Sequence, residues 1–334
     1  MLKSFLVTGG TGSFGQNFVK KIINSNYPIK RLVVFSRDEL KQYEMSKKFP
    51  ENKYKFMRYF IGDVRDLSRL KLATRDIDCI IHAAALKQVP AAEYNPIEFI
   101  KTNVIGAQNI IEASLDSSSV KKVIALSTDK ACSPINLYGA TKLCSDKLFI
   151  AANKLSGKLE TKYSVVRYGN VFGSRGSVAP LFLDQAKNGI FTLTHEDMTR
   201  FHISVDEGVD TVMWGIKNFY GGEILIPKIP SFRVIDLIKA IKEKNIIKKI
   251  GIRNGEKVHE EMISKSDNLN TIETKKFYFI LNDEKKLRNY FLKKFSSKKV
   301  AKNFYYSSDT NRIFLNIAQL KIILKEYAAT KKNN

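Results

Sequence analysis

The sequence predicts an α/β protein whose larger part is a doubly wound parallel sheet, followed by a smaller α/β lobe. Three observations indicate this fold: short, continuously apolar segments, amphipathic segments that alternate with them, and a glycine-rich turn directly after the first apolar segment. Strands of a parallel sheet are apolar along their length because helices cover both faces. The 334 residues are enough for about two domains.

The elements follow one another regularly through residue 170. Apolar runs predict strands over 5–10, 31–36, 55–63, 79–85, 121–128 and 163–170. Helical spacing predicts helices in SFGQNFVKKIINS, DELKQYEMSKKF, DLSRLKLAT, NPIEFIKTNVIGAQNIIEASL and NLYGATKLCSDKLFIAANKL. After residue 170 we expect helices in SVAPLFLDQAKNG, VDEGVDTVMWGIKNF and FRVIDLIKAIKE, and strands in ILIPK and KFYFIL. The expected division is a first domain over 1–170, rejoined by 203–228, and a substrate-binding lobe over 171–202 and 229–334.

The chain is strongly basic, with a formal net charge of +23. Such a charge normally suggests nucleic-acid binding. The excess is mostly lysine spread along the chain, and no nucleic-acid motif accompanies it. We therefore expect solvated lysine-rich faces and some attraction for an anionic substrate, and no nucleic-acid partner.

Membrane, disulfide and metal classes are disfavoured. No apolar run approaches the ~20 residues that span a bilayer, and MLKSFLVTGG is a poor signal peptide. Cys79, Cys132 and Cys144 form neither a disulfide framework nor a metal-ligand spacing, and the histidines do not either. Cys132 is expected to be a packing residue, since no histidine base is near it in sequence. These features predict a cytoplasmic protein without a metal or a membrane partner.

The turn TGGTGSFG, residues 8–15, predicts a dinucleotide site. It follows the first strand and opens the first helix, whose N-terminus would face a pyrophosphate. Gly9 allows the tight turn, Gly12 allows the backbone to approach the phosphates, and Gly15 allows the helix to pack closely on the strand. The spacing GxxGxxG resembles that of the short-chain dehydrogenase/reductase superfamily, which implies a Rossmann-type fold.

The end of the second strand bears on which nicotinamide cofactor fits. An enzyme that prefers NAD usually has an acid there to hold the ribose 2′-hydroxyl. Here the strand ends in Ser36, Arg37 and Asp38, with Lys41 one turn on. A hydroxyl, a guanidinium and an ammonium suit a 2′-phosphate, so we expect NADP. Asp38 is either the ribose acid or the N-cap of the next helix.

Residues after the third and fourth strands are expected to flank the adenine and its ribose. They are either small or polar, and small side chains allow a flat ring to approach closely, although they also serve close helix–sheet packing. These residues are Asp63, Val64, Ala83, Ala84 and Ala85.

Tyr138 and Lys142 lie four residues apart and so share one face of a helix. A cation there stabilises a phenolate and moves a tyrosine of ordinary pKa about 10 toward use as a base. This spacing arises often by chance. Its position after the fifth strand of a dinucleotide fold, with Ser127 and Thr128 ending that strand, makes a catalytic role the favoured interpretation.

Asp129 and Lys130 come directly after the fifth predicted strand, at the carboxyl edge of the sheet, where open α/β folds bind ligands. An enzyme that only oxidises an alcohol needs no further acid and base, so this pair predicts a second event, the removal of water. Oxidation of a sugar at C4 acidifies the C5 proton, so that a base can remove it while an acid assists departure of the C6 hydroxyl. The alternative is a surface salt bridge of little energetic value.

Together, these stretches resemble the inverting UDP-N-acetylglucosamine 4,6-dehydratases of pseudaminic acid synthesis. In that family a lysine at the Lys130 position is the C5 base, where retaining dehydratases carry Asp-Glu. A related dehydratase/5-epimerase group lacks the tyrosine of NLYGATK. The matching segments span about residues 5–264 and are TGGTGSFG, SRDELKQYEMS, FIGDVRDLSRL, HAAALKQVPAAEYNP, ALSTDKACSPINLYGATKLCSDKLF, VVRYGNVFGSRGSVAPLF, MTRF, GGEILIPKIPS and IGIRNGEKVHEEMI.

The resemblance implies roles for further positions. Arg253 and Glu256 would hold the nucleotide, with Arg200 in the same anion pocket or, alternatively, in a salt bridge between lobes. Asn170 would contact substrate or, alternatively, cap a turn. The implied catalytic residues are Thr128, Asp129, Lys130, Tyr138 and Lys142, the further cofactor residues are Thr11, Ser13, Phe14, Lys87 and Asn103, and the substrate residues are Lys87, Asn170, Val178, Arg200, Arg253 and Glu256.

The expected reaction is NADP-dependent dehydration of UDP-N-acetylglucosamine with inversion at C5, toward pseudaminic acid or a related surface glycan. The alternatives are a sugar-nucleotide 4-epimerase, a retaining 4,6-dehydratase, or a non-catalytic NADP-binding regulator. Residues 265–304 match the family only loosely until YYSSDTN. The superfamily also implies a homo-oligomer, either a dimer or a hexamer.

Overall fold

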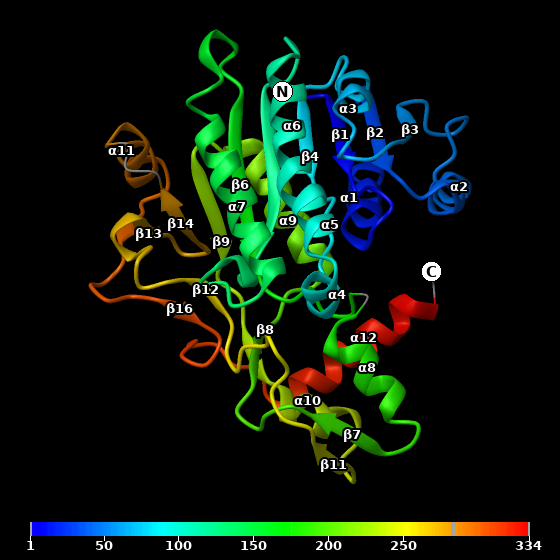
Figure 1. Cartoon of the computed structure of the whole chain (residues 1–334), viewed down its shortest axis with the longest axis vertical. Coiled ribbons are helices and arrows are strands. Elements are labelled where there is room, and N and C mark those ends of the chain that lie inside the picture. The colour runs from blue at the N-terminus through cyan, green and yellow to red at the C-terminus, as the bar shows by residue number, and fades with distance from the viewer. Residues whose placement is uncertain (1, 175, 282–284, 333–334) are drawn as a thin grey trace.

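The computed structural model describes residues 2–174, 176–281 and 285–332. A large sheet carries helices on both faces, and a smaller lobe lies below it in Figure 1. The parallel part of the sheet has neighbours in the order β3 (Met57–Ile61), β2 (Arg31–Ser36), β1 (Ser4–Thr8), β4 (Cys79–His82), β5 (Lys122–Thr128), β6 (Lys162–Tyr168) and β9 (Glu223–Pro227).

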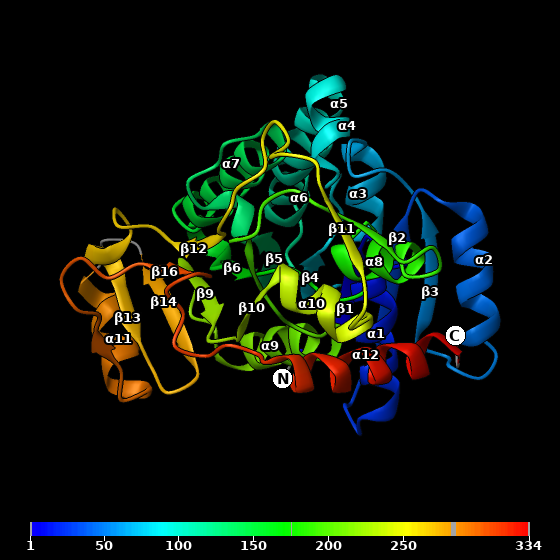
Figure 2. The same cartoon turned by 90° about the horizontal axis from the view of Figure 1, so that it is seen from below.

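The strand order reverses between β1 and β4, as the sequence predicted for a doubly wound sheet. The central strands β1 and β2 are buried almost throughout, which explains their apolar sequences SFLVT and RLVVFS. Helices α1 and α9 cover one face, and α3, α6 and α7 cover the other (Figure 2). Their bounds are α1 (Ser13–Asn24), α3 (Leu67–Ala73), α6 (Gly106–Leu115), α7 (Leu137–Ala152) and α9 (Val205–Asn218), and α2 (Glu39–Lys48) packs beside β2 and β3.

The segment predicted as one long helix before β5 is helical but irregular. It consists of α5 (Pro96–Phe99), a π-helical stretch η1 (Ile100–Ile105) and α6, and it follows the short helix α4 (Val89–Tyr94). Two short 3-10 turns, η2 (Asp129–Ala131) and η3 (Gly157–Leu159), precede and follow α7. The turn η2 contains the acid–base pair predicted from the sequence.

The sheet continues beyond β9 with antiparallel strands from the C-terminal half. β14 (Phe277–Leu281) pairs with β9, β13 (Thr271–Glu273) pairs with β14, and β15 (Lys298–Lys299) pairs with β13. Helix α11 (Lys285–Lys294) covers them, with the rings of Phe279 and Phe291 4.7 Å apart. We expected this stretch in the substrate-binding lobe, but its apolar strand FYFIL lies between β9 and β13 and extends the main sheet.

The smaller lobe has its own apolar core, which includes Phe182, Phe191, Leu237 and Leu320. It contains α8 (Val178–Gln185), α10 (Val234–Ile241), α12 (Ile317–Lys332), the parallel pair β7 (Ile190–Leu193) and β11 (Ile246–Lys249), and the antiparallel pair β8 (Thr199–Phe201) and β10 (Ser231–Arg233). Between lobe and sheet lie the paired strands β12 (Glu261–Ile263) and β16 (Tyr306–Ser307) (Figure 1). The turn η4 (Asn268–Asn270) packs against β14.

In the part of the chain that the structure describes, no helix is both long enough and apolar enough to cross a membrane.

Candidate active site

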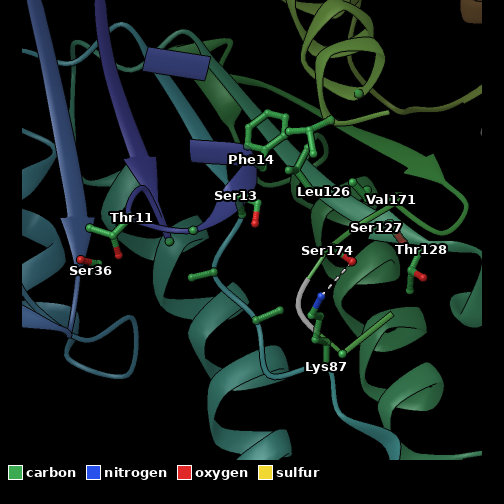
Figure 3. A pocket seen from close by; sticks show the side chains of 18 of the residues that line it. Thr11, Ser13, Phe14, Ser36, Lys87, Leu126, Ser127, Thr128, Val171 and Ser174 are labelled. Carbon is green, nitrogen blue, oxygen red and sulfur yellow. Dashed lines mark hydrogen bonds between the residues drawn. The ribbon is translucent and has the colours of Figure 1, made fainter. Parts of the chain in front are cut away.

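A cavity of about 610 Å³ lies at the carboxyl ends of the parallel strands, bounded by the glycine turn, the ends of β2 and β4–β6, and the loop after β6 (Figure 3). Most of the predicted residues line it: Gly9, Thr11, Gly12, Ser13, Phe14, Ser36, Arg37, Asp38, Lys41, Val64, Ala83, Ala84, Ala85, Lys87, Thr128, Lys130, Tyr138, Lys142 and Asn170. The other predicted residues are Gly15, Asp63, Asn103, Asp129, Val178, Arg200, Arg253 and Glu256, and they lie outside its lining.

The glycine turn closes the cavity on one side in the conformation that its spacing predicted. Gly9 has φ of +64°, and a Cβ there would lie 2.9 Å from the backbone of Ala84. A Cβ on Gly15 would lie 2.2 Å from the carbonyl oxygen of Gly10, so only glycine lets α1 pack this close. Helix α1 begins at Ser13 without any side-chain cap. Its first amides therefore remain available to an anion in the cavity.

The end of β2 presents basic groups to the cavity. Asp38 is the N-cap of α2, since its Oδ1 accepts a hydrogen bond of 3.0 Å from the Lys41 amide, and its other oxygen pairs with the Lys41 ammonium. Of the two roles left open for Asp38, the structure shows the N-cap. The guanidinium of Arg37 lies 3.6 Å from Asp63, whose pKa is held low by Arg65 and Arg37 although burial opposes this.

The segments after β3 and β4 contribute small side chains to the cavity lining, and Asn103 holds the segment after β4 by hydrogen bonds. The Asn103 amide exchanges hydrogen bonds of 2.9 Å with both backbone groups of Leu86 and donates to Thr141. It therefore fixes the segment after Ala85 without reaching the cavity. Lys87 does face the cavity, where its Nζ lies 3.4 Å from Ser174 (Figure 3), and burial followed by the charge of Lys130 lowers its pKa.

Helix α7 brings Tyr138 and Lys142 to the cavity, beside Thr128 at the end of β5. Burial raises the pKa of Tyr138 to about 12, and the nearby positive charge of Lys130 acts in the opposite direction. Lys142 donates a hydrogen bond of 2.8 Å to the Leu126 carbonyl, and burial lowers its pKa. A tyrosine and a lysine with these surroundings can exchange a proton with a hydroxyl group in the cavity.

Lys130 lies between two buried carboxylates. Its Nζ is 3.1 Å from Oδ1 of Asp129 and 3.2 Å from Oε1 of Glu260, a residue that the sequence analysis did not single out. Burial acts against the ammonium, but both carboxylates hold the pKa of Lys130 above its usual value. Asp129 has no exposed surface, and burial raises its pKa. Thr128 joins the cluster by donating to Asp129 Oδ1 at 2.9 Å.

The residues assigned to the nucleotide are arranged differently from the expectation. Arg200 is buried and donates to the carbonyls of Thr199, Val258 and Lys257, with Glu256 at 3.6 Å and Glu260 at 3.9 Å. It fastens the loop before β12 rather than lining the cavity. Arg253 is exposed on that loop, and Val178 begins α8 next to the lining residue Ser177.

The segment after β6 contributes more residues to the cavity lining than the sequence predicted. Besides Asn170, whose Oδ1 has no hydrogen-bond partner among the described residues, the loop after β6 supplies Gly169, Val171, Ser174 and Ser177 to the lining, and Tyr168 at the end of β6 joins them. A polar, glycine-rich segment directly after a buried strand was the available signal, because parallel strands end at the same edge of the sheet.

A buried ion pair between Arg167 and Asp146 connects the elements that carry the site. Arg167 on β6 donates to Asp146 on α7 at 3.0 Å and to the Met262 carbonyl on β12 at 3.0 Å. Ser127 on β5 donates to the same Asp146 oxygen at 2.8 Å. These bonds join α7, which carries Tyr138 and Lys142, to the strand that follows Glu260.

Comparisons with known proteins identify relatives of the chain. Residues 5–282 match the family model described as polysaccharide biosynthesis protein. A UDP-N-acetylglucosamine 4,6-dehydratase (inverting) from Campylobacter jejuni is 51% identical over 316 residues, covering 92% of this chain and 93% of that protein. A protein named UDP-glucose 4-epimerase from Rickettsia akari is 41% identical over 332 residues, covering 96% of this chain and 95% of its own.

Solved structures also resemble the chain. Pen from Bacillus thuringiensis is 34% identical, with a TM-score of 0.88 and coverage of 98% of both chains. DesIV, a dTDP-glucose 4,6-dehydratase from Streptomyces venezuelae solved with NAD, shares the fold at 22% identity and a TM-score of 0.66, over 76% of this chain and 86% of that one. The predicted fold class and the family resemblance are thus confirmed. With its match over residues 5–282, the chain belongs to the polysaccharide biosynthesis protein family.

Proposed function

We propose that the chain catalyses the dehydration of UDP-N-acetylglucosamine at C4 and C6 with inversion at C5. The product would be UDP-2-acetamido-2,6-dideoxy-β-L-arabino-hex-4-ulose. The observation that carries the proposal is the Lys130–Asp129 pair, 3.1 Å apart, whose lysine lines the same cavity as Tyr138 and Lys142. The name of the Campylobacter relative, at 51% identity, supports the substrate.

The cavity suits a nicotinamide dinucleotide, which supplies a hydride acceptor when bound. The uncapped start of α1 and the close approach allowed by Gly9 fit a pyrophosphate. We infer that the form is NADP. Ser36, Arg37 and Lys41 line the cavity, while the Asp38 carboxylate is engaged by its own helix and by Lys41. A 2′-phosphate would take Arg37 from Asp63 and Lys41 from Asp38.

This preference is tested by identifying the cofactor released from purified protein and by measuring binding. Replacing Arg37 and Lys41 together by alanine removes two charge-assisted contacts, so the affinity for NADP is expected to fall by roughly 10- to 100-fold or more. The affinity for NAD is the internal control and should change little. Equal losses for both cofactors would contradict the 2′-phosphate role.

The chain's own residues divide the proton transfers. Tyr138 takes the proton of the C4 hydroxyl, with Lys142 supplying positive charge next to it. Lys130 takes the C5 proton once the C4 ketone has acidified it. Asp129 supplies a proton to the departing C6 hydroxyl. Because Asp129 is fully buried, that proton must pass through Thr128 or Lys130, which both line the cavity.

The decisive experiment is incubation with UDP-N-acetylglucosamine in D2O without added coenzyme, followed by proton NMR. Deuterium at C5, a C6 methyl signal and L-arabino couplings are the expected result. A D-xylo product would retain the dehydratase and contradict the role given to Lys130. Absence of reaction in protein that holds NADP would favour another sugar nucleotide, or a non-catalytic regulator.

A 4-epimerase is the second candidate, because the Rickettsia relative bears that name at 41% identity. Epimerisation needs the Tyr138–Lys142 pair and no acid and base at C5 and C6. The same NMR experiment separates the two candidates. An epimerase gives the C4 epimer without a C6 methyl signal and without deuterium at C5.

The assembly also remains a proposal. We propose a homo-oligomer, a dimer or a hexamer, formed through the helices next to β4 and β5. The support is a set of exposed apolar side chains on α4 to η1, which includes Tyr94 (86% exposed), Ile97 (57%) and Ile105 (47%). Light scattering after size exclusion tests it. The cytoplasmic location and the route to pseudaminic acid stay predictions from the sequence.

A further inference from the structure

Glu260 lies against the acid–base pair and has no role in the reaction as derived so far. It directly precedes β12, and its carboxylate Oε1 is 3.2 Å from Lys130 Nζ. The side chain of Glu260 is only 4% exposed, whereas that of Lys130 is 22% exposed and reaches the cavity. The Lys130 ammonium is therefore shared between a carboxylate on its own turn and one from a distant segment.

Several contacts hold Glu260 in this position. The backbone of Glu260 is fixed by two hydrogen bonds to Ser308. Its amide donates a hydrogen bond of 2.9 Å to Ser308 Oγ, and its carbonyl accepts one of 2.8 Å from the Ser308 amide. Arg200 Nε lies 3.9 Å from the same carboxylate oxygen that faces Lys130. Arg167 fastens the adjoining strand through Met262. The second oxygen, Oε2, is buried without a hydrogen-bond partner among the described residues. Glu260 is therefore held in one position next to the Lys130 ammonium.

The two carboxylates have different surroundings. Asp129 is fully buried, with Lys130 as its cation at 3.1 Å, and burial raises its pKa. Burial also opposes the charge of Glu260, but Lys130 and Arg200 together hold the pKa of Glu260 below its usual value. Glu260 faces two cations, Lys130 at 3.2 Å and Arg200 at 3.9 Å, whereas Asp129 faces Lys130 alone among the described residues, so a proton is less favourable on Glu260 than on Asp129.

We propose that Glu260 is a positioning residue that stays charged, holds Lys130 Nζ in place by its ion pair, and thereby leaves Asp129 as the partner that carries the transferable proton. This proposal rests on the proposed dehydratase function and deepens it.

The proton count balances in this scheme. In the reactive form, Lys130 is a neutral amine and Asp129 is protonated. The amine takes the C5 proton, the electron pair of the C5–H bond forms the C5–C6 double bond, and the C6–O bond breaks. The proton of Asp129 leaves with the hydroxyl as water. Lys130 ends as an ammonium and Asp129 as a carboxylate, while Glu260 neither gains nor loses a proton.

The proposal predicts a change in the basicity of Lys130. An opposite charge at this distance raises the pKa of a lysine by about one to three pH units, so Glu260→Gln should lower it by at least about one unit while keeping the side-chain volume. The charged or titratable groups that act on Lys130 from the surrounding elements are Asp129, Glu260, Arg200, Tyr138 and, across the cavity, Lys87. All except Glu260 stay unchanged in this variant.

The first test does not need turnover. Purified protein is treated with acetic anhydride at pH 9, and acetylation of Lys130 is followed by peptide mass spectrometry. E260Q should react about tenfold faster than the wild type or more, because one pKa unit is a tenfold change in free amine. Glu261→Gln is the matched control, because Glu261 lies outside the cavity lining and the ion pairs of Lys130 among the described residues are with Asp129 and Glu260. Equal rates in E260Q and wild type overturn the proposal.

The second test is the pH profile of kcat with UDP-N-acetylglucosamine. Both limbs should move to lower pH by about one unit or more in E260Q, because the Lys130–Asp129 pair loses the same negative charge in every protonation state. A uniform loss of rate without a shift identifies a merely structural glutamate and overturns the proposal. An inactive wild type refutes the dehydratase function, while the acetylation result still judges Glu260. If E260Q does not fold, Glu260→Ala replaces it, because it also removes the carboxylate, and an unchanged acetylation rate there overturns the proposal.

Discussion

The buried pair of Asp146 and Arg167 allows a quantitative prediction about stability. The two side chains are 1% and 3% exposed, and their ion pair of 3.0 Å is accompanied by the bond from Ser127 to Asp146. Asp146→Ala removes the carboxylate and leaves the guanidinium buried, with the Met262 carbonyl as its remaining hydrogen-bond acceptor among the described residues. Breaking one partner of a buried pair costs about 3–5 kcal/mol, a large share of the usual 5–15 kcal/mol of a folded protein.

The assay is urea unfolding followed by circular dichroism at one fixed protein concentration, because association would otherwise change the apparent stability. Asp146→Asn keeps an acceptor for Ser127 and Arg167, so it should lose less than the alanine variant. The double variant Asp146→Leu with Arg167→Met removes both charges and should recover most of the loss. A loss of unfolding free energy below about 1 kcal/mol in Asp146→Ala would refute this reasoning. A double variant whose loss equals the sum of the losses in Asp146→Leu and Arg167→Met alone would refute it too.

Three further predictions concern catalysis, the glycine turn and pH. Tyr138→Phe should lower kcat by roughly 10²- to 10⁴-fold with cofactor still bound, as measured by NMR turnover and cofactor extraction, and a rate within a factor of ten would remove Tyr138 from proton transfer. Gly15→Ala places a Cβ 2.2 Å from the Gly10 carbonyl oxygen, so it should lower stability by more than about 1 kcal/mol, and an unchanged urea midpoint would contradict this. Burial raises the pKa of Glu223 from 4.5 to about 7, so its contribution to stability is complete below pH 4.5 and is lost as pH rises through 7. The decline in unfolding free energy between pH 5 and 7 should therefore be smaller in Glu223→Gln than in the wild type. Equal pH dependence of the unfolding free energy in the two proteins would contradict this prediction.

Local patterns predicted the parallel half of the protein because its signals are local. The runs that became β1 and β2 are buried throughout, so each segment reports its own environment. The glycine turn was predictable for the same reason, since Gly9 has φ of +64° and Gly15 packs on Gly10 within the turn, although the Ala84 backbone that Gly9 approaches is remote in sequence. Tyr138 and Lys142 were recognised by their spacing on one helix face.

Long-range contacts were beyond such patterns. Glu260 reaches Lys130 across 130 positions of sequence, and nothing in GIRNGEKVHEEMI distinguishes it from the neighbouring Glu256 and Glu261. Arg200 was expected either in an anion pocket or in a salt bridge between lobes, and its guanidinium contacts Glu256, Glu260 and carbonyls of a loop that is remote in sequence. The pairing of β14 with β9 depended on which sheet edge was open, and this is settled only by the complete fold.

The contribution of Glu260 and Arg200 also determines when the site can exist during synthesis. The dinucleotide side of the cavity is built from the first 88 residues or so, together with strands that are made before residue 170. A ribosome-bound chain that ends before residue 260 still lacks the carboxylate facing Lys130, and the Ser308 groups that hold Glu260 come later still. Domains fold from the N-terminus as they emerge. The growing chain can therefore assemble a nucleotide cradle and the Lys130–Asp129 pair well before it makes the carboxylate that positions Lys130.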